Sequence, residues 1–326
     1  MNESPVTGGQ DELEVLHRAL RDLRRQIRLR SFARSEIHSA GEVPREFQWQ
    51  ELFDELRHRL GTFGMVERSA EVDEFGMDDI SLARSRALLD FLMDRYWRVE
   101  VAGLDAIDSS RPNLLVANRS GLLPYDGLML SHAVERWHPE RARPRFLVAD
   151  WLITLPFAQP SLARLGGVRA CRENADRLLR TGHSVIAFPE GVKGAAKVFA
   201  ERYRLKRFGR GGVIRAAVEN RVPLVPVGIV GAEEAHPILF KAMLPARALG
   251  MPFVPVTPTF PLLGPLGLLP LPTKWIVEIG DPIPLDSLEA GALDDDLLLS
   301  RLNEELRSRI EKLVSQALER RASAWA

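Results

Sequence analysis

The sequence predicts an α/β fold, in which a largely parallel central sheet is flanked by helices and preceded by a helical N-terminal extension. Short apolar runs rich in β-branched residues alternate with segments of helical period along most of the chain. Several of these runs are apolar at nearly every position, which is typical of parallel strands buried on both faces. The expected strands are Arg98–Ala102, Asn113–Ala117, Arg145–Ala149, Ser184–Phe188 and Pro223–Val230.

Helical segments separate these strands and close the chain. The expected helices between strands are Gly127–Trp137, Asn174–Thr181 and Gly211–Asn220. Leucine and isoleucine recur at helical spacing from Leu298 to Leu318, which predicts an amphipathic helix that packs on the domain. A polar, glycine-containing stretch ends near residue 75, so we expect a helical extension over residues 1–75 and an α/β domain over residues 76–326.

Residues 11–34 predict an amphipathic helix with a strongly basic side. Its apolar positions follow a 3-4-3-4 spacing, as in a short coiled coil, and residues 21–34 hold six arginines against one acid. Three roles fit this pattern. The helix could pack with a solvated basic face, contact a partner or a second copy of the chain as a dimer, or lie on an anionic membrane.

Composition excludes several classes of protein. The 326 residues include 44 basic and 44 acidic side chains, so no global positive field attracts nucleic acid. The single cysteine rules out an intramolecular disulfide and a cysteine-type zinc site, and the seven histidines form no metal-binding spacing. We therefore expect no metal site. The first residues lack the basic and apolar regions of a signal peptide, so we expect a cytoplasmic protein.

Residues 248–273 contain no charged side chain, and this length would allow a membrane span. Seven prolines interrupt the run, however, and a broken helix leaves backbone groups without hydrogen bonds in lipid. We therefore exclude a transmembrane helix. The segment either packs on the domain as an apolar loop or enters the membrane interface beside a lipid-binding tunnel.

Polar residues gather where four of the expected strands end. These segments are Asn118–Asp126, Leu165–Asn174, Pro189–Gly194 and Gly231–His236. Because the carboxyl ends of parallel strands meet at one edge of a sheet, where ligands bind, we expect the segments to form one site. Their basic residues favour an anionic substrate.

These segments resemble the four sequence blocks of the glycerolipid acyltransferases of the lysophosphatidic acid type. Phe188-Pro189-Glu190-Gly191 matches the third block, with Lys193 in place of its arginine. Arg172 stands where the second block has its arginine, and Val222–Val227 matches the fourth block. Together the blocks cover about residues 98–285.

The resemblance implies an enzyme that moves a fatty acyl group from acyl-CoA or acyl carrier protein to a hydroxyl of a lysophospholipid or glycerol-type acceptor. In the family, a histidine oriented by an aspartate removes the hydroxyl proton, and no covalent enzyme intermediate forms. The resemblance further implies that Arg172, Glu190, Gly191 and Lys193 bind the acceptor. It also implies no resident cofactor and a peripheral position on the inner face of the membrane.

The first block departs from the family pattern. Arg119 stands where the family has its histidine, and six residues rather than four separate Arg119 from Asp126. A guanidinium cannot accept a proton at neutral pH, although it can bind a phosphate or pair with Asp126. The catalytic candidates are therefore Asp126, Arg119 and His236, the last because it follows the final expected strand at the same edge. The alternative function is a non-catalytic lipid- or acyl-binding relative that has lost its base.

Overall fold

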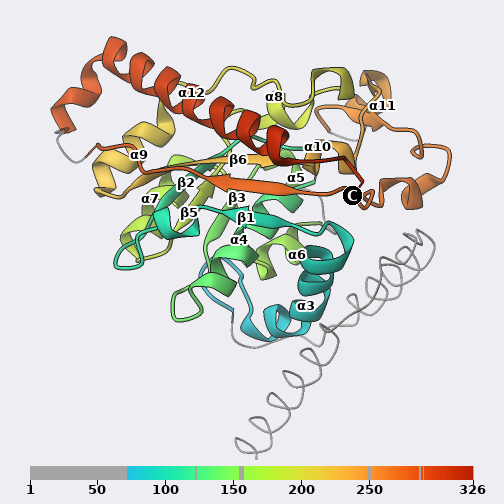
Figure 1. Cartoon of the computed structure of the whole chain (residues 1–326), viewed down its shortest axis with the longest axis horizontal. Coiled ribbons are helices and arrows are strands. Elements are labelled where there is room, and N and C mark those ends of the chain that lie inside the picture. Colours follow the sequence, from blue (N-terminus) through green and yellow to red (C-terminus); the bar gives the residue numbers. More distant parts are fainter. Residues whose placement is uncertain are drawn as a thin grey trace, which may run out of the picture. The chain divides into compact units, whose positions relative to one another are not determined.

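Seven strands form one sheet in the order β1-β9-β6-β2-β5-β3-β4 (Figure 1). The computed structural model describes residues 72–121, 123–153, 158–248, 251–285, 288 and 290–325. The strands are β1 (Glu100–Ala102), β2 (Leu114–Ala117), β3 (Arg145–Val148), β4 (Gly167–Arg169), β5 (Val185–Ala187), β6 (Leu224–Val230) and β9 (Ile276–Ile279). The strands from β6 to β4 are mutually parallel, whereas β9 runs antiparallel to β6, and β1 follows the direction of β9. The expected largely parallel sheet is confirmed.

Helices cover both faces of this sheet (Figure 1). On one face lie α3 (Asp79–Phe91), its π-helical continuation η1 (Leu92–Tyr96) and α4 (Tyr125–Trp137). On the other face lie α7 (Arg172–Arg180), α9 (Gly212–Asn220) and α12 (Asp296–Arg320). The shorter helices are η2 (Leu104–Ala106), α5 (Asp150–Ile153), α6 (Ala158–Arg164), α8 (Gly191–Ala195), η3 (Phe199–Glu201), α10 (Ala232–Ala235), α11 (Met243–Ala248), η4 (Gly264–Leu268) and η5 (Ala290–Asp294).

Two hydrophobic cores lie on opposite faces of the sheet, and successive residues of β2 alternate between them. Leu115 packs in the core that contains α3 and α4, whereas Leu114 and Val116 pack against α7, α9 and α12. Every residue of β2 is at most 1% exposed, which explains its uninterrupted apolar sequence. In β6, Gly228 permits the close approach of α12, because a Cβ there would lie 2.8 Å from the backbone of Leu313.

The structure differs from the sequence-based expectations at two strands of the sheet and in the apolar run. The strands β4 and β9 were not predicted. Residues 248–273 contain β8 (Val254–Val256), which pairs antiparallel with β7 (Phe240–Ala242), and the short helix η4. Within the described ranges, no helix is both long and apolar enough to cross a membrane. The basic helix expected at residues 11–34, with its possible dimer contact, lies outside the described residues.

Candidate active site

Arg119 and Asp126 form a buried ion pair at the carboxyl end of β2. Nη1 of Arg119 lies 2.5 Å from Oδ1 of Asp126, and the two side chains are 8% and 0% exposed. The backbone N–H groups of Ser120 and Gly127 also donate to the carboxylate, at 2.9 and 2.8 Å. Burial raises the pKa of Asp126, and the positive charge of Arg119 opposes this shift.

Glu190 connects the end of β5 to the end of β2. Its Oε1 accepts a hydrogen bond from the backbone N–H of Arg119 at 2.8 Å, and its Oε2 accepts one from that of Lys206 at 2.6 Å. The packing here is tight, because a Cβ at Gly194 would lie 2.6 Å from Cβ of Glu190 and 2.7 Å from Cβ of Arg119. Glu190 therefore fixes the backbone from which the Arg119 side chain extends.

A second buried ion pair, Lys197–Glu233, lies beside Glu190 and was missed by the sequence reasoning. Nζ of Lys197 lies 2.6 Å from Oε1 of Glu233 and 3.4 Å from Oε2 of Glu190. The backbone N–H of Tyr203 donates to Glu233 at 2.7 Å. Burial raises the pKa of Glu233, and Lys197 opposes the rise. The sequence contains one signal for this pair: two consecutive glutamates, Glu233 and Glu234, follow β6 at the edge where the other site segments converge.

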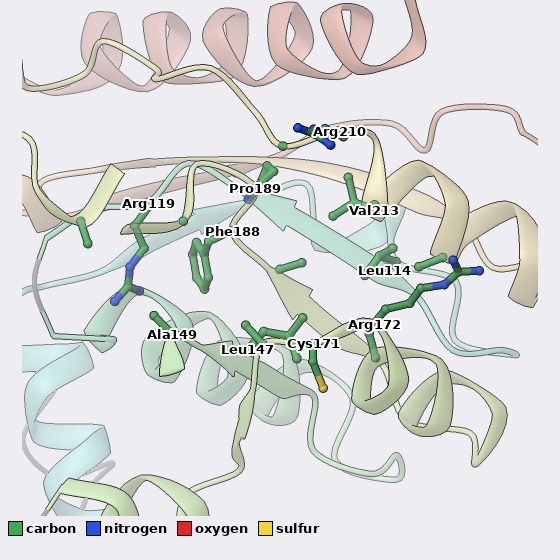
Figure 2. Close-up of a pocket in the computed structure, with 18 of the residues that line it drawn as sticks. Leu114, Arg119, Leu147, Ala149, Cys171, Arg172, Phe188, Pro189, Arg210 and Val213 are labelled. Carbon is green, nitrogen blue, oxygen red and sulfur yellow. The ribbon is translucent and has the colours of Figure 1, made fainter. Parts of the chain in front are cut away.

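An apolar cavity of about 320 Å³ opens beside Arg119, bordered by the sheet and by helices α7 and α9. Its charged lining residues are Arg119, Arg172 and Arg210, and most of the others are aliphatic or aromatic. Figure 2 shows Arg119 and Arg172 at opposite sides of the cavity, with Phe188 and Leu147 between them. The guanidinium carbon of Arg119 lies 5.0 Å from the centre of the Phe188 ring, a favourable cation–π distance.

The structure separates two residues that were expected to meet at the acceptor. Arg172 begins α7 at the surface, where its guanidinium lies 2.6 Å from Glu219. Lys193 is exposed on α8 and lines a different cavity from the one that Arg172 lines. Gly191, in contrast, lines the apolar cavity next to Arg119. The structure thus brings Arg119, Asp126, Glu190 and Gly191 together, and it holds Arg172 and Lys193 apart.

His236 is buried and does not line the apolar cavity. Its Nε2 lies 2.7 Å from the carbonyl oxygen of Leu268, and its ring stacks on Tyr125 with the centres 5.8 Å apart. Burial lowers the pKa of the imidazole, so the ring is neutral at pH 7. Because a carbonyl only accepts hydrogen bonds, Nε2 carries the proton and Nδ1 is left as the basic nitrogen. Its catalytic role stays a prediction.

Comparison with known proteins identifies the family of the chain. The family model described as "Acyltransferase" matches residues 98–230, which include Arg119, Asp126, Arg172 and Glu190. The chain is also 44% identical over 248 residues to "Uncharacterized protein ML2427" of Mycobacterium leprae, which covers 76% of this chain and 68% of that protein. This chain belongs to the acyltransferase family. The acyltransferase is likewise 43% identical over 248 residues to "Uncharacterized protein Rv0502" of Mycobacterium tuberculosis, with coverages of 76% and 69%.

Among solved structures, this acyltransferase is similar to the crystal structure of the 1-acyl-sn-glycerophosphate (LPA) acyltransferase PlsC from Thermotoga maritima. The match has a TM-score of 0.48 and 16% sequence identity, and it covers 83% of this chain and 91% of that chain.

Proposed function

We propose that this acyltransferase moves a fatty acyl group from acyl-CoA or acyl carrier protein to a hydroxyl of a lysophospholipid or glycerol-type acceptor. The observation that carries the proposal is the apolar cavity that ends at Arg119, next to the buried carboxylate of Asp126. A fatty acyl chain gains about 0.8 kcal/mol for each methylene removed from water, so such a cavity favours long-chain substrates.

In the proposed reaction, the acceptor hydroxyl oxygen attacks the thioester carbonyl carbon, the C–S bond breaks, and the hydroxyl proton leaves with the thiolate. Arg119 stays charged at neutral pH, so it supplies positive charge for the oxyanion that develops on the carbonyl. Asp126 is the nearest carboxylate to Arg119, and the rise in its pKa makes it a better proton acceptor. His236, through Nδ1, is the second candidate base.

A non-catalytic lipid- or acyl-binding protein is the second candidate function. The Arg119–Asp126 pair favours it, because the Asp126 oxygens already accept hydrogen bonds from Arg119, Ser120 and Gly127. A relative of this kind keeps the apolar cavity and lacks an available base.

Labelled acyl-CoA and acyl carrier protein, each offered with a panel of lysophospholipids and glycerol 3-phosphate, distinguish the two functions. We expect product formation, and we expect Asp126→Asn to slow it about 100-fold, the usual scale of general-base assistance. Asp150→Asn is the matched control, because that carboxylate is exposed and pairs with Arg169 at the surface. Acyl-chain binding without product from any pair of substrates would support the second candidate.

Peripheral contact with the inner face of the membrane is part of the proposal. Among the described residues, seven of the fourteen exposed large hydrophobic side chains lie between residues 239 and 266. This apolar patch consists of Leu239, Phe240, Met243, Leu244, Leu262, Leu263 and Leu266. A concentration of this kind is typical of a membrane or protein contact, and the exposed Lys241 suits anionic lipid.

Vesicle flotation tests the membrane contact. Leu244 and Leu262 are 81% and 85% exposed, so replacing both by serine removes apolar area without disturbing the core. We expect binding to anionic vesicles to fall at least tenfold, since one buried leucine is worth about 1.5–3 kcal/mol. Leu297→Ser on α12, at a position 73% exposed and outside the patch, is the control. Equal flotation of all three proteins would contradict this part of the proposal.

A further inference from the structure

A second cavity, the cationic groove, adjoins the apolar cavity. It has a volume of about 990 Å³ and lies between the segment 189–193, the turn 207–211 and the first part of α12. Pro189, Gly209, Arg210 and Asn303 line both cavities. In Figure 2, Arg210 lies between Pro189 and the helix drawn in pale red, on the opposite side of Pro189 from Leu147. One ligand with two chemically different ends can therefore contact both cavities.

Four cations and three carboxylates line the groove, so its net charge is positive and favours anions. Glu190 accepts hydrogen bonds from two backbone N–H groups, Glu304 pairs with a lining arginine, and Asp296 is exposed. Lys193, Arg207 and Arg210 are exposed there, and the described part of the chain shows no ion pair for any of them. The fourth lining cation, Arg307, pairs with Glu304 at 3.1 Å. Helix α9 starts from this turn without a side-chain cap, so the positive end of its dipole adds to the attraction.

Resting on the proposed function, we infer that the cationic groove binds the phosphorylated nucleotide end of an acyl-CoA donor whose acyl chain occupies the apolar cavity. The volume of the groove is at the upper end of the roughly 300–1,000 Å³ that is typical of sites for whole ligands. This volume is far larger than one acceptor phosphate requires. Three cations without ion pairs suit a ligand with several phosphates. Lys193, which the family resemblance assigns to the acceptor, belongs to the donor side in this arrangement.

Calorimetric titration with CoA and with adenosine 3′,5′-bisphosphate tests the inference on the full chain. We expect both probes to bind the wild type, more weakly at high salt. Arg207→Gln and Arg210→Gln should each weaken both probes about tenfold, the effect of losing one charge-assisted contact. Arg301→Gln is the matched control, because Arg301 is exposed on α12 and does not line the groove. It should change the affinity less than twofold.

Three results would overturn the inference: no binding of either probe, unchanged dissociation constants in both variants, or a rise in KM for glycerol 3-phosphate with unchanged CoA affinity. The third result would place the acceptor phosphate in the groove. If the first result is accompanied by transfer from acyl carrier protein, the inference fails and the proposed function stands. Groove-dependent CoA binding without transfer to any acceptor supports the inference and refutes the proposed function.

Discussion

Replacing Arg119 with methionine tests whether the Arg119–Asp126 pair is as buried as the structure indicates. Methionine keeps apolar contact with Phe188 but removes the cation 2.5 Å from the Asp126 carboxylate. Asp126 is 0% exposed at its side chain, so water cannot replace the lost charge, and the Ser120 and Gly127 N–H groups remain its donors. Removing one partner of a buried pair costs about 3–5 kcal/mol, a large part of a total stability of about 5–15 kcal/mol.

A double-mutant cycle separates this charge effect from lost packing. Arg119→Met combined with Asp126→Asn removes both charges, so the double variant should be more stable than the sum of the single losses predicts. We expect a coupling of about 2 kcal/mol, within the range for residues in direct contact. Urea unfolding followed by far-ultraviolet circular dichroism at neutral pH measures the three losses.

A loss of less than about 1 kcal/mol of unfolding free energy for Arg119→Met, or single losses that simply add, would show that the pair is not a buried, coupled ion pair. Catalysis provides an independent readout for the same residue. If Arg119 stabilises the oxyanion, Arg119→Met loses acyl transfer while it retains acyl-chain binding. If the wild type is instead a non-catalytic relative, Arg119→His should introduce slow transfer, provided that Asp126 reaches the new imidazole.

Three further predictions concern the cavity, the acceptor and pH. Gly212 lines the apolar cavity, and the space at its Cβ position is open, so Gly212→Leu should exclude the longest acyl chains. Their affinity should fall roughly fourfold for each methylene that no longer fits, measured as kcat/KM against chain length. Gly291→Leu, at an open position outside the cavity, should leave this dependence unchanged. Arg172→Gln should raise KM for a phosphorylated acceptor about tenfold and leave KM for the donor unchanged. If the variant and the wild type have the same KM for the acceptor, Arg172 does not bind the acceptor and serves only its ion pair with Glu219. Burial holds the pKa of His236 below its ordinary 6.5, so below pH 6.5 the unfolded chain takes up a proton that the folded chain does not. The free energy of unfolding should therefore fall with decreasing pH by up to about 1.4 kcal/mol per unit, and His236→Asn should lose that slope in denaturant titrations; an identical slope would show that His236 protonates equally in both states.

The sequence by itself determined the layered α/β fold and the family. Strands such as β2 are buried on both faces, so their sequences are unbroken apolar runs that can be recognised directly. The helical period of apolar residues identifies the segments between them. The motif residues Arg119, Asp126 and Glu190 follow strand ends, and the rule that parallel strands share one carboxyl edge was enough to bring them together. Strand β4 was not predicted because Gly167-Val168-Arg169 contains only one large apolar side chain, and β9 because it follows a proline-rich run.

Tertiary structure alone decided which side chains meet at that edge and which do not. Lys197 and Glu233 pair across 36 residues, and Glu190 binds backbone N–H groups rather than facing the apolar cavity. Neither contact is encoded by local spacing, because each depends on how separate loops fold over the strand ends. Arg172 and Lys193 stand in neighbouring motifs, yet they line two different cavities that share Pro189, Gly209 and Asn303 in their linings. These shared residues come from three distant segments, and hydrogen bonds from Gly209 to Pro189 and from Asn303 of α12 to Gly209 bring them together.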